Sequence, residues 1–335
     1  MFSRTIFSLV LAGMLGGLAG CKRSAQEVVV YTSVDQPFSE PVLQAFERQS
    51  RIAVRAVYDT EETKSTGVVN RLVAEAGNPQ ADVFWSGDPV RAFLLTKRGI
   101  VEPYVSPNAA DVPGQFKALD GTWTGSAARA RILLVNRKRV SADAMPTSVR
   151  DLADPRWKGQ TAIANPLFGT TTMHVAALFA LWGENRADAF LKALRVNEVR
   201  VASSNGEVKR LVVGGEVAFG LTDTDDANEA LKDGADVEVV YPDQNGDGTV
   251  VMPTAIALMK GPNRENGKRL VDYLVSADVE QLMANEAAHM PLRRGVTTPS
   301  GIRAVEQVRA MKVDYAQLGD VMEHIQPRLR EWAGL

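Results

Sequence analysis

Polar side chains gather in short loops that follow the expected β-strands of this sequence. They carry hydroxyl, amide and carboxylate groups, and several precede a helix start, whose backbone N–H groups attract anions. A single loop of this kind is commonly a turn or a helix cap, but recurrence after successive strands favours a site for a small polar solute. The residues expected to contact a ligand are Ser33, Asp35, Ser86, Gly87, Asp88, Arg129, Gly169, Thr170, Thr171, Asn205, Asp223, Thr224, Asp225 and Asp226.

The loop 223–226 is the most acidic of these segments. Its carboxylates suit a hard cation, an ammonium group or the hydroxyls of a solute. Asp225 and Asp226 are the candidate metal ligands. The structural alternative is a solvated helix N-terminus, where acidic residues are favourable.

The opposite charge is supplied by Arg129 or Arg131 and by the expected helix start at Thr170-Thr171. Together these groups would hold the anionic end of a solute. A molecule with an amine at one end and an acid at the other, such as an aminophosphonate, fits this charge placement.

A second acidic stretch, Asp243–Gly248, matches the opening of a calcium-binding EF-hand loop. The match ends at the twelfth position, which is Thr254 rather than glutamate, and a strand rather than a helix is expected to follow. A turn between two strands is therefore favoured, with weak calcium binding as the alternative.

The sequence lacks the motifs of the common α/β enzymes. It has no Gly-x-Ser-x-Gly elbow, no Ser-x-x-Lys, no His-Glu-x-x-His and no phosphate loop ending in Gly-Lys-Ser/Thr. Its three histidines, His174, His289 and His324, are far apart and lack metal-ligand spacing. We therefore expect a protein that is not an enzyme.

The N-terminus has the layout of a signal peptide. Arg4 precedes an apolar stretch from Ile6 to Leu18, which is shorter than the roughly 20 residues that span a bilayer. A positive start, a short apolar segment and small residues are typical of secretory signals. The sequence therefore predicts a signal peptide over residues 1–20.

The motif Leu18-Ala19-Gly20-Cys21 resembles the bacterial lipobox, in which the cysteine is acylated and becomes the first mature residue. Cys21 is the only cysteine of the chain, and a lone thiol would otherwise be a liability in an exported protein. We expect a lipid-anchored tether over residues 21–27 on the periplasmic side of a membrane. An ordinary secretory signal is the alternative.

Composition limits the remaining possibilities. Removing residues 1–20 from the 335-residue chain leaves 315 residues, and losing Arg4 changes the net charge from −2 to about −3. This balance, without a basic block, argues against nucleic acid as a partner. The length suggests two lobes, and the single cysteine leaves packing rather than an internal disulfide to hold them.

Apolar patterning predicts alternating strands and helices, which favours an α/β fold with helices on both faces of a mostly parallel sheet. The expected strands are Val28–Tyr31, Arg51–Tyr58, Ala81–Trp85, Ile132–Asn136, Thr161–Ala164, Ala218–Leu221, Val237–Tyr241 and Val250–Met259. The expected helices are one beginning near Pro37, Val68–Ala76, Val90–Thr96, Thr171–Trp182, Ala187–Leu194, Leu270–Leu274, Val279–Asn285 and Ile302–Met311.

Six segments of the chain form a recognisable set: Val28–Tyr31, Ala81–Trp85, Gly99–Pro103, Arg131–Asn136, Asp154–Gly159 and Gly215–Gly220. Through these segments the chain resembles, over residues 28–330, the bacterial extracellular solute-binding proteins of the ferric-iron-transport type. The run Asp154-Pro-Arg-Trp-Lys-Gly159 is the most distinctive of them.

The resemblance implies a two-lobed periplasmic-binding-protein fold, type II-like, with mixed sheets and a hinge between the lobes. It implies a monomeric substrate-binding component of an ABC-type importer, which closes on a small polar or ionic solute and delivers it to a permease. No resident cofactor is expected, a metal ion being at most the transported ligand. We expect lobe 1 at 28–128 plus 257–305, and lobe 2 at 129–256 plus 306–335.

The chain departs from the iron-binding pattern of that family at three places. Ferric-binding members have adjacent tyrosines after the strand equivalent to Ala218–Leu221, where this chain has Asp225-Asp226. Asp35 stands where a histidine is frequent, and Gly87 where an acid is frequent. The solute is thus ferric iron or another metal ion or, alternatively, an aminophosphonate or a phosphorylated small molecule. An α/β enzyme and an adhesion lipoprotein are distant alternatives.

Overall fold

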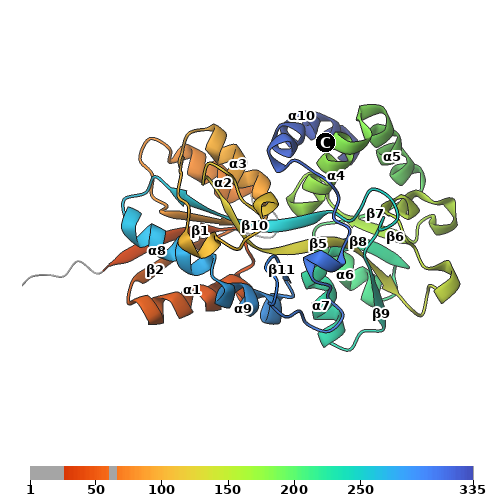
Figure 1. The fold of residues 1–335 in the computed structure, drawn as a ribbon. Coiled ribbons are helices and arrows are strands. Elements are labelled where there is room, and N and C mark those ends of the chain that lie inside the picture. The colour runs from red at the N-terminus through yellow and green to blue at the C-terminus, as the bar shows by residue number, and fades with distance from the viewer. Residues whose placement is uncertain (1–25, 60–65, 335) are drawn as a thin grey trace, which may run out of the picture.

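The computed structural model describes residues 26–59 and 66–334, so the expected signal peptide, Cys21 and most of the tether lie outside the described residues. Figure 1 shows two α/β lobes joined through the middle of the molecule by two long strands, β5 (Thr124–Asn136) and β10 (Val251–Met259). The expected two-lobed α/β fold is confirmed.

The strands form one continuous hydrogen-bonded path through both lobes, in the order β2-β1-β3-β10-β5-β8-β6-β7. Pairing is parallel within the outer parts of the path and antiparallel around β5 and β10. The sheet is therefore mixed, as expected. The other strands are β1 (Glu27–Thr32), β2 (Ala53–Tyr58), β3 (Val83–Ser86), β4 (Val101–Glu102), β6 (Thr161–Ala164), β7 (Arg200–Ala202), β8 (Phe219–Asp223), β9 (Val237–Val240) and β11 (Met290–Pro291).

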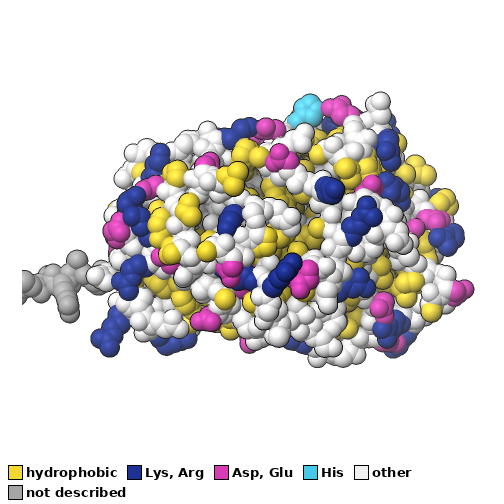
Figure 2. Space-filling view, in the orientation of Figure 1, with side chains coloured by type: hydrophobic (Ala, Val, Ile, Leu, Met, Phe, Trp, Pro, Cys, Tyr) yellow, Lys and Arg dark blue, Asp and Glu magenta, His cyan; other side chains and the backbone are white. Residues whose placement is uncertain are grey.

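Helices cover the sheet in each lobe (Figure 1). They are α1 (Gln36–Ser50), α2 (Thr66–Ala74), α3 (Pro89–Lys97), α4 (Gly169–Trp182), α5 (Glu184–Val196), α6 (Asn205–Val213), α7 (Thr224–Lys232), α8 (Arg264–Leu274), α9 (Ala277–Ala287) and α10 (Tyr315–Ala333). None of the helices in the described ranges is long and apolar enough to cross a membrane. Figure 2 shows basic and acidic side chains interspersed over one face of the molecule.

Strand β5 is the element that connects the lobes and positions the site. All thirteen of its residues are buried. Its first part pairs with β10 and β11, and its second part pairs with β8 and β9. Arg129 is opposite Met252 of β10, whereas Arg131 is opposite Asp223 of β8. Two arginines on one face of a single strand therefore stand at the junction of the lobes. The lobe boundaries stay a prediction.

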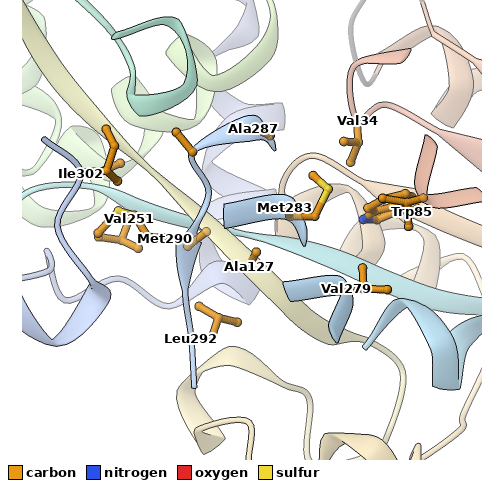
Figure 3. Packing of buried hydrophobic residues seen from close by; sticks show 14 of the residues in the cluster. Val34, Trp85, Ala127, Val251, Val279, Met283, Ala287, Met290, Leu292 and Ile302 are labelled. Atoms are coloured by element: carbon orange, nitrogen blue, oxygen red, sulfur yellow. The ribbon is translucent and has the colours of Figure 1, made fainter. Parts of the chain in front are cut away.

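The largest hydrophobic cluster in the described ranges extends through both lobes and includes a buried indole and small side chains of β5. Figure 3 shows Trp85 of β3 beside Met283 and Val279 of α9, with Ala127 of β5 close to Met290. Trp85 is fully buried. Alanines in β5 leave room for these larger side chains, so the strand that carries the site is packed on both faces.

The C-terminal helix α10 packs against α4 in lobe 2 and also against α3 in lobe 1. At the second contact, Gly319 lies against the side chains of Leu94 and Phe93. The prediction of a helix at Ile302–Met311 is wrong, because this segment holds only a 3-10 turn at Val305–Gln307. Its backbone instead bonds to Thr249, through Arg309 O and Met311 N, and such tertiary pairing overrides a helical pattern.

A close approach at Gly220 in β8 gives a stability prediction. A Cβ atom there would lie 2.5 Å from Val208 Cγ1 and 3.0 Å from Ala162 O. Overpacking of this kind costs about 1–3 kcal/mol, so we expect Gly220→Ala to lower the unfolding free energy by about 2 kcal/mol in urea denaturation. Gly77→Ala, where nothing lies within 4 Å of the added atom, is the matched control and should be neutral.

Candidate ligand-binding site

A polar pocket lies between the lobes, at the carboxyl ends of β1, β3, β6, β7 and β8, where ligands bind in open α/β sheets. Lobe 1 contributes three lining residues, and β5 and lobe 2 contribute the rest. The lining residues are Ser33, Gly87, Asp88, Arg129, Ala164, Asn165, Phe168, Gly169, Thr170, Thr171, Ser203, Ser204, Asn205 and Asp223. The structure thus brings together nine of the residues that the sequence singled out.

A cluster of four buried charges forms the floor of the pocket. Arg129 Nη1 lies 3.3 Å from Asp223 Oδ2 and 3.2 Å from Asp225 Oδ2, while its Nη2 donates to Gly87 O at 2.9 Å. Arg131 Nη1 donates to Asp223 Oδ1 at 2.6 Å. These side chains are at most 8% exposed. Two arginines and two aspartates cancel in charge, so the acids are occupied rather than free for a cation.

The pKa directions of Asp223 and Arg129 agree with ionised groups in this cluster. Burial raises the pKa of Asp223, but the attraction of Arg131 and Arg129 outweighs burial and holds that pKa below its ordinary value. Burial lowers the pKa of Arg129, yet the carboxylates of Asp225, Asp223 and Asp35 raise it above its ordinary value. The charges of Asp223 and Arg129 are therefore maintained by their partners.

The wall opposite lobe 1 is the start of α4. Thr170 Oγ1 accepts from Arg131 Nη1 at 3.0 Å and from Asn205 Nδ2 at 2.9 Å, and it donates to Asp223 Oδ2 at 3.0 Å. Thr171 Oγ1 accepts from Arg131 Nη2 at 3.1 Å, which leaves its own hydroxyl hydrogen for a ligand. No side chain caps the N-terminus of α4. Its first N–H groups and its dipole therefore favour an anion in the pocket.

The candidate metal ligands Asp225 and Asp226 have different partners. Asp225 lies against Arg129, whereas Asp226 Oδ2 accepts from Thr222 Oγ1 at 2.7 Å behind the pocket lining. In residues 26–59 and 66–334, no group of three or more His, Cys, Asp or Glu side chains is arranged to hold a metal ion. The metal assignment stays a prediction, and both carboxylates already accept hydrogen bonds within the protein.

Asp226 gives a pH-dependent stability prediction. Burial and the charges of Asp225 and Asp223 raise its pKa to about 8, whereas the unfolded carboxyl ionises near pH 4. Rising pH between these values favours the unfolded wild type. Asp226→Asn keeps the acceptor for Thr222 without ionising. The unfolding free energy of Asp226→Asn should therefore exceed that of the wild type by an amount that grows by about 3–4 kcal/mol from pH 5 to pH 8.

Urea denaturation at several pH values across this window measures the effect. Asp236→Asn is a matched control at an exposed aspartate, and it should show the pH dependence of the wild type. If Asp226→Asn also followed the wild-type pH dependence, Asp226 would titrate normally in the folded protein.

The remaining predicted site residues make structural contacts in the pocket lining or beside it. Asp88 lines it and also caps α3, accepting from Arg91 N at 3.1 Å. Ser86 Oγ accepts from Asp88 N, and Thr224 Oγ1 from Ala130 N, both at 3.3 Å, so these two serve the backbone. Asp35 and Asp225 border a smaller cavity that adjoins the pocket at Ser33, Gly87 and Arg129.

The set of ligand contacts predicted from the sequence omits five residues that line the pocket, although Phe168, Ser203 and Ser204 lie in loops expected to surround the ligand: Ala164, Asn165, Phe168, Ser203 and Ser204. The predicted set also omits Arg131, although this residue bonds four side chains of the lining, those of Thr170, Thr171, Asn205 and Asp223. The sequence does indicate that Arg131 belongs to the site. Arg129 and Arg131 are two residues apart, and residues with this spacing share one face of a strand.

The segment Asp243–Gly248 belongs to the framework of lobe 2. Asp243 accepts from Ser148 Oγ at 2.5 Å and from Val149 N at 3.1 Å. Asp247 Oδ2 accepts from Trp182 Nε1 and Arg150 Nη2, both at 2.8 Å. These acids hold a turn to its neighbours, in keeping with the favoured interpretation of the EF-hand-like stretch.

Comparison with known proteins places this geometry in a family. Residues 78–318, more than half of the chain, match the family of bacterial extracellular solute-binding proteins. The chain is 26% identical over 342 residues to iron uptake protein A1 of Synechocystis, covering 95% of this chain and 92% of that protein. It is 24% identical to the Fe(3+)-binding periplasmic protein of Serratia marcescens over 91% of this chain and 90% of the relative.

Solved structures share the fold at lower sequence identity. Iron-bound HitA from Pseudomonas aeruginosa superposes with a TM-score of 0.82 at 22% identity, over 92% of this chain and all of HitA. The periplasmic binding protein AfuA from Actinobacillus pleuropneumoniae, with fructose-6-phosphate bound, gives 0.81 at 22% identity, over 93% of this chain and all of AfuA. The chain therefore belongs to the bacterial extracellular solute-binding proteins and is the substrate-binding component of an ABC-type importer, capturing a small polar or ionic solute between two lobes.

Proposed function

We propose that the transported solute carries a compact anionic group, namely a phosphate or phosphonate, which binds at the N-terminus of α4. The observation that carries this proposal is the uncapped start of α4 beside Arg131, which bonds Thr170 and Thr171. Because the four buried charges of the floor cancel, they leave the positive end of the α4 dipole uncompensated at this wall of the pocket. The positive end of the α4 dipole therefore attracts an anion rather than a cation.

The donors of the pocket favour such a solute over a bare ferric ion. None of the six tyrosines, all of which lie in described residues, lines the pocket. A metal ion would have to displace Arg129 or Arg131 from Asp223 and Asp225, which exposes a buried charge. Ferric iron is the second candidate, favoured by the names of the relatives, and it would reach this pocket most readily as a complex with an anion.

Calorimetry on the purified protein separates the two candidates. The probes are fructose 6-phosphate, 2-aminoethylphosphonate, inorganic phosphate and ferric citrate, with citrate alone as the control. We expect saturable binding of at least one phosphorus-containing probe. We also expect this probe to be recovered chemically unchanged, because the protein is proposed to be a carrier without enzymatic activity. Binding of ferric citrate alone would overturn the first candidate and support the second.

We also propose that Cys21 is acylated and anchors the protein at the periplasmic side of the membrane. The lipobox-like motif and the absence of any other cysteine support this proposal. Cys21→Ala should move the protein from the membrane fraction to the soluble fraction and abolish labelling by an alkynyl palmitate analogue. The protein released in this way should be a monomer by light scattering.

A further inference from the structure

Phe168 occupies an unusual position at the pocket. Its side chain lines the pocket and remains 37% exposed. Its neighbour Leu167 is buried in the lobe 2 core, whereas Phe168 belongs to none of the hydrophobic clusters of the described residues. No ring stacking or cation–π contact involves it within those ranges. Core packing therefore does not explain this aromatic ring.

Local helix structure does not explain it either. Phe168 is the N-cap residue of α4, with extended backbone angles of φ −134° and ψ 158°. That position favours serine, threonine, aspartate or asparagine, whose oxygen would bond the first N–H groups of the helix. A phenylalanine leaves these groups uncapped. The residue thus keeps the anion-attracting helix start open and places an aromatic ring next to it.

We propose that Phe168 is a specificity-determining residue, whose ring contacts the carbon skeleton of a solute bound by its anionic group at the start of α4. This inference rests on the proposed function and narrows it to an organic phosphate or phosphonate with a hydrocarbon or sugar-ring face. An aromatic side chain supplies a large apolar contact at small entropic cost. Ser33 and Asp88 of lobe 1, which also line the pocket, suit the hydroxyl groups of such a molecule.

The test compares an organic phosphate with the bare anion. Phe168→Ala should weaken binding of fructose 6-phosphate about tenfold, while inorganic phosphate, which has no carbon skeleton, should change less than about twofold. Phe168→Tyr, which keeps the ring, should retain wild-type affinity for both. Leu119→Ala removes a 97% exposed side chain that is absent from the pocket lining, and it should change neither affinity.

The outcomes separate this inference from the proposed function. Equal losses for both probes in Phe168→Ala would mean that the residue only shapes the helix start, and an unchanged affinity for fructose 6-phosphate would mean that the ring does not contact the solute. Either result overturns the inference and leaves the anion site intact. If wild-type protein bound ferric citrate but no phosphorus-containing probe, the proposed function and this inference would fail together.

Discussion

Asp223→Ala is expected to lower the unfolding free energy by about 3–5 kcal/mol, because removing one partner of a buried ion pair leaves uncompensated charge. Asp223 accepts from both Arg129 and Arg131, and it also accepts from Thr170. Without it, Arg131 keeps only hydroxyl and amide partners in a site where its side chain is 0% exposed. Urea denaturation followed by circular dichroism at neutral pH measures the loss.

Asp233→Ala is the matched control, since Asp233 follows the last turn of α7 and is exposed. It should change stability by less than about 0.5 kcal/mol. The folded pKa of Asp223 is below its ordinary value, so its contribution is present above pH 4 and declines as pH falls. The difference in unfolding free energy between the wild type and Asp223→Ala should therefore become smaller at acidic pH. A loss below about 1 kcal/mol at neutral pH would show that Asp225 alone can compensate both arginines.

The fold was predictable where burial leaves an apolar pattern. The run Val28–Tyr31 indicated β1 because a strand covered on both faces is apolar throughout. Strand β5 was expected only from Ile132, yet it begins at Thr124. Residues 124–128 are all small, and Arg129 and Arg131 follow with an alanine between them. The segment is buried because it pairs with β10 and β11 and because the arginines pair with carboxylates. Such burial depends on partners distant in sequence.

The longest helix, α10, was not predicted. Leu318, Met322, Ile325 and Leu329 have the spacing of one buried helical face. Pro327 lies between the last two, and a proline inside a helical pattern usually indicates its end. Packing of the buried face against α3 and α4 outweighs the hydrogen bond that the proline removes.

The site was predictable as a set of loops but not as a charge distribution. Strand ends identified most lining residues, because the carboxyl ends of strands meet at one place in this architecture. Three aspartates within four positions suggested an acidic pocket. The register of β5 against β8 instead places Arg131 opposite Asp223, and Asp226 lies against Thr222. Cross-strand register is a tertiary property, so the neutral cluster could not be derived from spacing in the sequence.

Thr171→Asp is expected to weaken binding of an anionic probe such as fructose 6-phosphate by at least about 100-fold, because like charges in a closed site cost several kcal/mol. Thr171 lines the pocket and accepts from Arg131 Nη2 at 3.1 Å. A carboxylate there would accept from the same arginine and would sit in the first turn of α4, where acids stabilise a helix. Affinity should therefore fall while the melting temperature does not.

Thr171→Val separates the added charge from the lost hydroxyl. It has the same shape but no hydrogen-bonding group, and it should weaken the anionic probe by only about tenfold, the effect of one hydrogen bond to a charged group. Binding of ferric citrate to the same two variants tests the alternative that the solute is iron. If Thr171→Asp bound iron as tightly as the wild type and kept its affinity for fructose 6-phosphate, the α4 start would not be the anion site. Its dipole would then serve the fold alone, and the ligand would lie nearer Asp35 in the adjoining cavity.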